Sequence, residues 1–284
     1  MQIAELICPV CRLKLVRFEG TLKCASGHSY DEAREGYVNL VTGKAPRATQ
    51  GDNVQMVRAR RAFLRRGYYQ PLVVELRKIL TGINHESGPL VLADIGCGEG
   101  YYLGELTGES KHTAIRAYGT DISKSAIRLG AKTYPNVCFA VADTNDLIPL
   151  ASAGVDVCLN IFAPRNAAEF ARIVRPGGLL VVVIPTQDHL ASLRERFGLL
   201  DIESGKLAKI TSQLTGFDLT NSQSASGSIR LDGPSASDLV AMTPSARHVD
   251  PEALERLAQV RDLTTEASFQ VLVFSRRGQE RGEA

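Results

Sequence analysis

Short apolar runs alternate with polar, helix-forming segments through the middle of the chain. Five runs have the length of strands and few polar breaks: 90–96, 114–121, 137–143, 155–163 and 178–185. The segments between them predict helices at 101–108, 123–134 (capped by Ser123) and 166–174. Continuous apolar strands connected by helices are typical of a parallel sheet covered on both faces. We therefore expect an α/β fold, with residues 266–277 adding an antiparallel edge to complete a seven-stranded sheet.

The pattern before residue 90 differs. Residues 42–53 are polar, contain Gly and Pro, and predict a linker. Residues 53–66 predict a helix with one basic face: Arg58, Arg60, Arg61, Arg65 and Arg66. A second helix is expected after Pro71. We predict three units: a small module at 1–41, a linker with a basic helical segment at 42–84, and the α/β domain at 85–284.

Composition and charge narrow the class of protein. The 284 residues are 44% hydrophobic, enough for a buried core, and no apolar run reaches the roughly 18 residues of a membrane span. The first residues lack the pattern of a signal peptide, so we expect a cytoplasmic protein with reduced thiols and no membrane partner. Residues 1–70 carry a net charge of +6 and the remainder −4. A basic arm on an acidic body suits a polyanionic partner, although a solvated basic face is the simpler alternative.

A glycine-rich loop follows the first core strand, in "LADIGCGEG". It contains Asp94, Gly96, Gly98, Glu99 and Gly100, and such glycines allow a ligand to approach the backbone closely. The dinucleotide fingerprint requires a small residue at position 101, which is tyrosine, so the G-x-G-x-G spacing favours S-adenosylmethionine over NAD(P).

Two further acids support that choice of cofactor. Asp121 ends the second core strand, where a carboxylate can accept hydrogen bonds from both ribose hydroxyls. Asp143 ends the third strand, where the adenine amine would lie. Each acid alone could be a cap or turn residue. Together with the glycine loop they predict a class I, Rossmann-like methyltransferase fold.

The first 28 residues contain half of the cysteines, with the spacing Cys8-x2-Cys11-x12-Cys24-x3-His28. Two such knuckles match tetrahedral Cys3His ligation of Zn²⁺. A module this small cannot bury enough apolar surface, so the metal would supply folding free energy, and four protein ligands make the zinc structural. The alternative is a set of buried free thiols with an incidental histidine.

Several motifs together resemble one family. The knuckles, "DEAREGYVNL", "MVRARRAFLRRGYYQPL", "DIGCGEGYY", "NIFAPRN" and "MTPSA" are similar in sequence and order to those of 23S rRNA guanine-N1 methyltransferases. "NIFAPRN" and "PTQDHL" resemble the branch acting at nucleotide 748, linked to macrolide resistance, more than the branch acting at 745. The resemblance implies S-adenosylmethionine as methyl donor, a hairpin loop of 23S rRNA as target, and a homodimer. It also implies that Tyr69, the Gly98–Glu99 loop and His189 lie near the cofactor.

Methyl transfer to guanine N1 requires loss of a proton and stabilisation of the charge that develops toward O6. "NIFAPRN" ends the fourth core strand, and we expect Arg165 to contact the base or a phosphate and Asn160 to be a polar contact or a strand-end cap. Phe162 and Pro164 could stack on a base. Arg58, Arg60, Arg61 and Arg65 are predicted to contact RNA phosphates.

Other functions use the same motifs. A small-molecule methyltransferase would leave the basic zinc module without a role, and a non-catalytic zinc-dependent RNA-binding protein would not need the intact cofactor loop. The N-P-P-Y and D-P-P-Y runs of DNA and protein methylases are absent.

Overall fold

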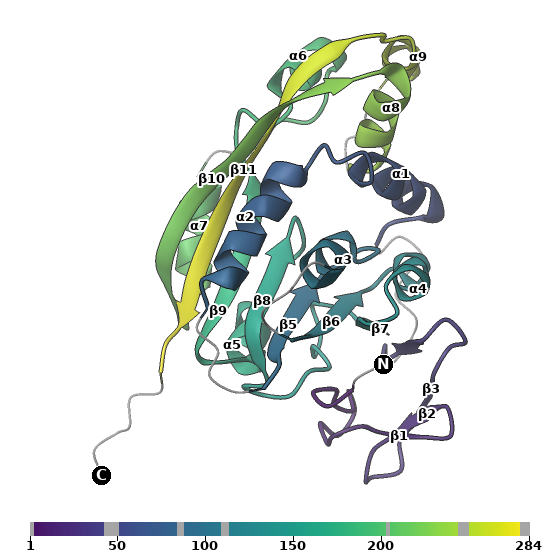
Figure 1. Ribbon diagram of the computed structural model, residues 1–284, viewed down its shortest axis with the longest axis vertical. Coiled ribbons are helices and arrows are strands. Elements are labelled where there is room, and N and C mark those ends of the chain that lie inside the picture. The colour runs from purple at the N-terminus through teal and green to yellow at the C-terminus, as the bar shows by residue number, and fades with distance from the viewer. Residues whose placement is uncertain are drawn as a thin grey trace.

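A computed structural model describes residues 3–42, 51–83, 88–108, 114–202, 205–243 and 250–278, so most of the predicted linker lies outside the described residues. The central feature is a sheet with the strand order β10-β11-β9-β8-β5-β6-β7-β4 (Figure 1). Its parallel strands from the predicted apolar runs are β5 (Leu90–Ile95), β6 (Ile115–Asp121), β7 (Cys138–Val141), β8 (Val155–Ile161) and β9 (Val174–Pro185). The predicted class I α/β fold is confirmed.

One edge of the sheet is a long antiparallel ribbon. β10 (Phe217–Leu231) pairs with β11 (Leu263–Arg276), and β11 pairs with β9. β11 is buried on alternate residues early in the strand and continuously later, where it lies between two neighbours. The predicted antiparallel strand is therefore present, but it lies inside the sheet and β10 forms the edge.

The opposite edge corrects the prediction of seven strands. β4 (Tyr37–Asn39) pairs in parallel with β7, aligning Val38 with Ala140, and the sheet has eight strands among the described residues. Val38 is fully buried. The predicted 1–41 module thus contributes its last strand to the main sheet.

Helices cover both faces of the sheet. On one side lie α1 (Val54–Leu64), α2 (Gln70–Thr81), α3 (Tyr101–Gly108), α4 (Lys124–Thr133), α6 (Ala191–Phe197), α8 (Gly233–Ala241) and α9 (Pro251–Ala258). On the other lie α5 (Ala167–Ile173) and α7 (Lys206–Gln213). Alternate residues of β5 enter the two hydrophobic cores, Leu90 and Leu92 in one and Val91 and Ala93 in the other. This explains why the strand is apolar at every position.

The N-terminal module is a three-stranded antiparallel sheet of β1 (Val16–Phe18), β2 (Thr21–Lys23) and β3 (Ser29–Asp31). It lies beside β7 at the end of the large sheet (Figure 1). Glu5 ties it to β6: its carboxylate accepts from Arg116 at 2.6 Å and from the hydroxyl of Tyr118. Leu6 and Leu15 of the module share a hydrophobic core with β5 and β8. None of the described helices combines the length and apolar character needed to cross a bilayer.

Candidate cofactor cleft and metal site

A cleft of about 730 Å³ opens at the carboxyl ends of the parallel strands. From β5 the chain runs outward through β6 to β7, and it then crosses back to form β8 on the other side of β5. Open α/β sheets bind ligands at such a switch point in strand order. The cleft receives residues that follow five strands, among them Asp94, Asp121, Asp143, Phe162 and His189. All the predicted cofactor residues except Gly100 line it.

The glycine loop needs glycine for two separate reasons. Gly96 and Gly100 have φ values of +83° and +76°, which side-chain-bearing residues rarely adopt. A Cβ on Gly96 would lie 2.4 Å from the Cβ of Ala163, and one on Gly100 would lie 2.5 Å from the ring of Phe139. The loop therefore fits closely between β6, β7 and the turn after β8.

Asp121 fixes this loop from the neighbouring strand. One carboxylate oxygen accepts from the backbone N–H of Gly98 and the other from that of Ser123, each at 2.8 Å. Ser123 is also the N-cap of α4, as predicted. Each oxygen keeps a further lone pair for a ligand.

Asp94 presents a buried carboxyl group to the cleft. The residue is 1% exposed, and neither carboxylate oxygen has a hydrogen-bond partner in the described part of the chain. Burial, with a contribution from Asp121, raises its pKa to about 8. A carboxylate without partners in a ligand cleft suits a cationic ligand group.

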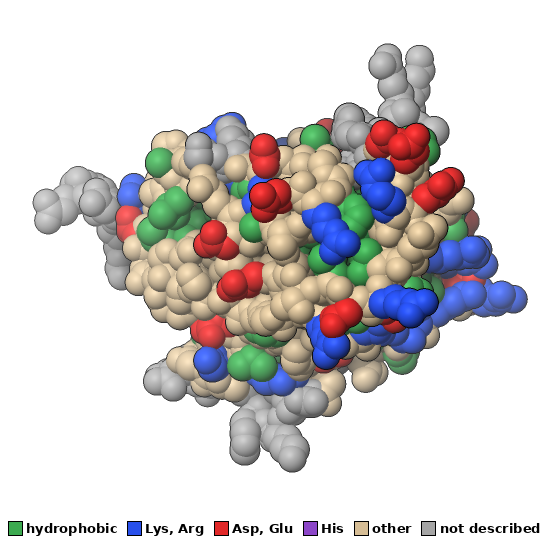
Figure 2. Space-filling model, turned by 90° about the horizontal axis from the view of Figure 1, so that it is seen from above, with side chains coloured by type: hydrophobic (Ala, Val, Ile, Leu, Met, Phe, Trp, Pro, Cys, Tyr) green, Lys and Arg blue, Asp and Glu red, His purple; other side chains and the backbone are tan. Residues whose placement is uncertain are grey.

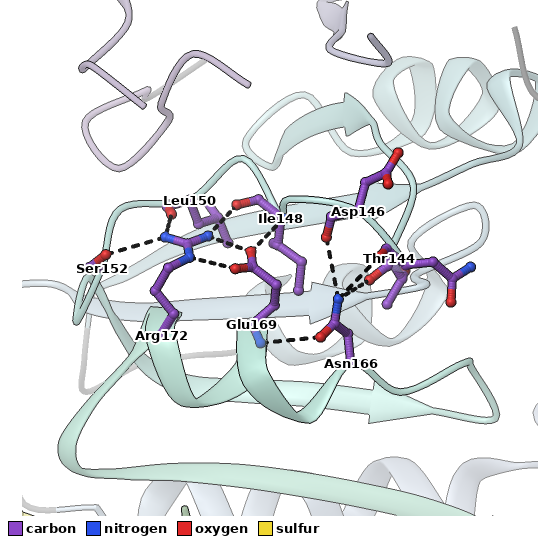
Figure 3. Close-up of polar contacts among 9 residues, drawn as sticks. Thr144, Asp146, Ile148, Leu150, Ser152, Asn166, Glu169 and Arg172 are labelled. Carbon is purple, nitrogen blue, oxygen red and sulfur yellow. Dashed lines mark hydrogen bonds and ion pairs between the residues drawn. The ribbon is translucent and has the colours of Figure 1, made fainter. Parts of the chain in front are cut away.

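The loop after Asp143 is held by side chains from α5 (Figure 3). The side-chain amide of Asn166 donates to the carbonyls of Thr144, Asn145 and Asp146 at 3.0–3.4 Å, while its oxygen caps α5 by accepting from the N–H of Glu169. One residue thus caps a helix and fixes the loop that carries Asp143.

Glu169 and Arg172 hold the next part of that loop. Glu169 accepts from the N–H of Ile148 at 2.7 Å. Arg172 donates to the carbonyls of Ile148 and Leu150 at 2.6 and 2.7 Å and forms an ion pair with Glu169 (Figure 3). Because these charged groups are mutually paired and partly buried, they restrain residues 144–152 against the body of the protein.

Tyr69 and His189 meet in the cleft although 120 residues separate them. The Tyr69 hydroxyl lies 3.3 Å from His189 Nε2, and Nδ1 of His189 accepts from the N–H of Ser268 at 3.1 Å. Burial lowers the pKa of His189 to about 4, so the imidazole is neutral. Its proton is therefore on Nε2, which donates to Tyr69 and leaves the tyrosine O–H free to donate to a ligand.

The turn after β8 forms the rim of the cleft. Phe162 is 45% exposed at a φ of +54°, unfavourable for an aromatic residue, and its ring lies 6.5 Å from that of Tyr69. Arg165 is half-buried at the rim and has no ion pair or hydrogen bond among the described residues.

The structure favours the strand-end cap for Asn160 over a polar contact with substrate. Asn160 is fully buried and does not line the cleft. Its amide donates to the carbonyls of Pro164 and Ile95 at 2.9 and 3.3 Å. It therefore acts as the alternative, a cap joining the ends of two strands.

The arginines of α1 do not form one basic face. Arg60 points into the cleft, pairs with Asp52 and donates to the carbonyl of Met242 at 3.3 Å, so it is not available as an exposed phosphate contact. Arg61 donates to Thr133 at 2.7 Å, and Arg66 pairs with Asp238 at 3.1 Å.

Arg58 and Arg65 are exposed, and their side chains form no hydrogen bond or ion pair among the described residues. Lys and Arg side chains gather along one side of the face in Figure 2, with acidic side chains among them.

The four predicted metal ligands converge. The ligand atoms of Cys8, Cys11, Cys24 and His28 all lie within 4.8 Å of one another. Distances of 3.5 Å between the sulfurs of Cys11 and Cys24 and 3.3 Å from Cys24 Sγ to His28 Nδ1 match the edges of a tetrahedron around Zn²⁺. The Tyr30 hydroxyl lies 3.2 Å from Cys8 Sγ, where it can donate to the thiolate. The set is closed, as in structural zinc sites.

Comparisons with known proteins agree with both sites. The family model for the N-terminal region of RlmA matches residues 6–45, and a methyltransferase domain matches residues 93–182. The 23S rRNA (guanine(748)-N(1))-methyltransferase of Streptomyces fradiae is 37% identical over 95% of this chain and 96% of its own length. The chain belongs to the family of RlmA-type 23S rRNA guanine-N1 methyltransferases.

Other relatives extend this picture. A Micromonospora griseorubida protein with a provisional guanine-N1 methyltransferase name is 38% identical over 89% of this chain and 90% of its own length. In fold alone, the chain resembles a Haloferax volcanii structure of the Trm112 methyltransferase activator in complex with a methyltransferase assigned provisionally. That likeness has a TM-score of 0.51 at 18% identity and covers 80% of this chain and 99% of that one.

As a member of this family, the chain uses S-adenosylmethionine and carries a Cys3His zinc site. The cleft fits the cofactor, because the carboxylate of Asp94, which has no partner among the described residues, suits its ammonium group and the Asp121 carboxylate keeps lone pairs for its ribose hydroxyls. We propose that Asp121 binds the ribose, the loop at Asp143 binds the adenine, and Tyr69 and His189 lie beside the methionine portion.

Sequence reasoning missed the residues that support the cleft from other elements. The pair of Asp52 and Arg60 joins the predicted linker to α1, and Asn166 acts through a loop 20 to 22 residues before it. "NIFAPRN" contains Asn166 as a helix cap, which sequence could have indicated. Its second set of contacts exists only in the folded chain.

The raised pKa of Asp94 predicts that cofactor binding is coupled to the release of a proton. Since its pKa is about 8 in the free protein and a cationic group should lower it, binding at pH 7 should release up to one proton that Asp94→Asn does not release. Calorimetry in buffers of different ionisation enthalpy measures this release. The variant should bind S-adenosylmethionine roughly tenfold or more weakly, the size of a lost charged hydrogen bond.

The free energy of unfolding of Asp94→Asn shows whether weaker cofactor binding reflects a damaged fold. The folded-state pKa lies above the unfolded value of 3.8, so this carboxyl group loses its stabilising contribution as the pH rises from about 4 to 8. The variant should therefore unfold no more easily than the unaltered chain at pH 8. Equal proton release by both proteins would contradict a role for Asp94.

Two substitutions of Asn166 should separate its effect on cofactor affinity from its effect on the stability of the fold. Asn166→Ser keeps a capping oxygen and loses the amide donors, whereas Asn166→Ala loses both. Both should weaken S-adenosylmethionine binding by about threefold to tenfold, because loop 144–146 is released, while only Ala should lower the free energy of unfolding by a further ~1 kcal/mol. Calorimetry and urea unfolding measure the two effects, and unchanged affinity in both variants would refute the role in positioning.

Proposed function

We propose that the chain transfers a methyl group from S-adenosylmethionine to N1 of a guanine in a hairpin loop of 23S rRNA, at nucleotide 748. The observation that carries this proposal is the 37% identity to the Streptomyces fradiae enzyme along nearly the whole of both chains. The intact cleft adds to it, since its glycines, three strand-end acids and paired Tyr69 and His189 occur together. A reaction on ribosomal RNA and reduced zinc thiolates both suit a cytoplasmic protein.

The chain's own contribution to the reaction is mainly positioning. The cofactor supplies an electrophilic methyl group on a sulfonium, and displacement requires the acceptor nitrogen in line with it. Phe162, exposed at the rim beside Tyr69, offers a face on which an extruded guanine can stack. The backbone N–H of Phe162 donates to the carbonyl of Val183 at 3.3 Å, a contact that helps to hold this strained turn.

The loss of the guanine N1 proton, and the negative charge that develops toward O6, constrain the roles of His189 and Arg165. His189 cannot accept the N1 proton, since Nδ1 is occupied by the N–H of Ser268 and Nε2 carries a proton. The guanidinium of Arg165, which has no partner in the described ranges, lies at the rim, where positive charge favours the negative charge that develops toward O6. Arg165 is thus the best-placed of the predicted substrate contacts.

Two finer expectations accompany the proposal. The family resemblance implies a homodimer, which light scattering tests, and an effect on macrolide sensitivity, which a deletion strain tests.

Primer extension on rRNA tests the proposed reaction. After incubation with S-adenosylmethionine and unmodified 23S rRNA, reverse transcriptase should stop one nucleotide before a single guanine, because methylation at N1 blocks base pairing. A stop at 748 would agree with the proposal, and a stop at 745 would place the chain in the other branch.

A matched control separates enzyme from contaminant. Gly96→Val would force a side chain against Ala163 at a φ of +83° and so distort the glycine loop, and its reaction should give no stop. If the unaltered chain binds the cofactor and also gives no stop, the proposed reaction on 23S rRNA is wrong.

A further inference from the structure

A second, smaller cavity of about 230 Å³ adjoins the cofactor cleft. It is lined by Arg165, Lys206, Lys209, Ile210 and Gln213. Arg165 and Lys206 also line the large cleft, so the two cavities share a wall. Three of these five residues are cationic, and no acidic residue lines the cavity in the described part of the chain.

Two of the three cations in this cavity have no neutralising partner among the described residues. Arg165 and Lys206 are half-buried and have no ion pair or hydrogen bond within the described ranges. Asp201, an acid that lines the large cleft, pairs with Arg194 at 3.1 Å. Burial lowers the pKa of Arg165, so the protein holds this charge at a cost that an anion would offset.

The backbone at the start of α7 also favours negative charge in this cavity. Helix α7 begins at Lys206, and its N-cap, Gly205, has no side chain to accept from the first N–H groups. Free N–H groups at a helix N-terminus favour an anion. Cationic side chains and helix terminus therefore act in one place.

We propose that this cavity binds a backbone phosphate of the RNA next to the target guanosine, an inference that rests on the proposed rRNA substrate. Its volume is about a third of that of the cleft, suited to a phosphate group while the guanine occupies the larger space. A phosphate contact fixes the register of a nucleic acid without reading its sequence. Arg165, between the cavities, would link the phosphate to the base being methylated.

The test removes the charge of single lysines in the protein and of single phosphates in the RNA, and measures whether the two losses depend on each other. A 23S rRNA hairpin is made with a single neutral methylphosphonate at each linkage around the target guanine in turn, and its Kd for the unaltered chain, Lys206→Ala and Lys209→Ala is measured. Lys78→Ala is the matched control, since Lys78 is an exposed lysine of α2 that lines neither cavity.

We expect one linkage to stand out. Its neutralisation should weaken binding by the unaltered chain and Lys78→Ala by roughly tenfold, and by much less for Lys206→Ala and Lys209→Ala, which have already lost the contact. The slope of log Kd against log salt should fall by about 0.7 in these two variants. Calorimetry with S-adenosylmethionine on Lys209→Ala should give the affinity of the unaltered chain.

Two outcomes overturn the proposal in distinguishable ways. If the unaltered chain methylates the hairpin but every linkage gives additive losses in Lys206→Ala and Lys209→Ala, the phosphate site is wrong and the proposed function stands. If the unaltered chain neither binds nor methylates the hairpin or 23S rRNA, the proposed function fails and the phosphate site fails with it.

Discussion

The cleft depends on one carboxylate. Asp121 accepts from the backbone of Gly98 on one side and Ser123 on the other, and so joins the glycine loop after β5 to the start of α4 after β6. Since parallel strands end at the same edge of the sheet, this bridge sets the spacing between the two loops on which the nucleotide portion of the cofactor would rest. The close contacts of Gly96 with Ala163 and Gly100 with Phe139 leave the loop little freedom to shift.

Around this fixed centre, side chains from distant segments close the cleft. Asn166, Glu169 and Arg172 hold the loop that carries Asp143, while Arg60 and Asp52 bring α1 and the preceding turn over the glycine loop. The zinc module is joined to the same framework, because β4 extends the sheet beside β7 and Glu5 binds two side chains of β6. Metal binding in the module therefore stabilises an edge of the domain that forms the cleft.

Much of this could be predicted from sequence, because the signals are local. Apolar runs gave the parallel strands, Ser123 gave the cap of α4, and acids following three strands gave one cluster. The zinc ligands follow from spacing alone. β4 was missed because three residues are too few to show a period, and it forms only by pairing with β7. The face of α1 was misassigned because helical spacing does not reveal that Asp52 lies near Arg60. Asn160 looked like a site residue because strand-end caps and ligand contacts occupy the same positions along a chain.

A crystal structure with S-adenosylhomocysteine tests the central claim most directly, namely that the strand-end acids and the Asp121 bridge form the cofactor site. The ribose should lie within hydrogen-bonding distance of Asp121, the adenine against the loop after Asp143, and the amino group at Asp94, with the sulfur facing Phe162 and Arg165. The hydrogen bonds from Gly98 and Ser123 to Asp121 should persist in the complex. A ligand bound away from these strand ends, or a complex in which Asp121 releases the glycine loop, would contradict this claim.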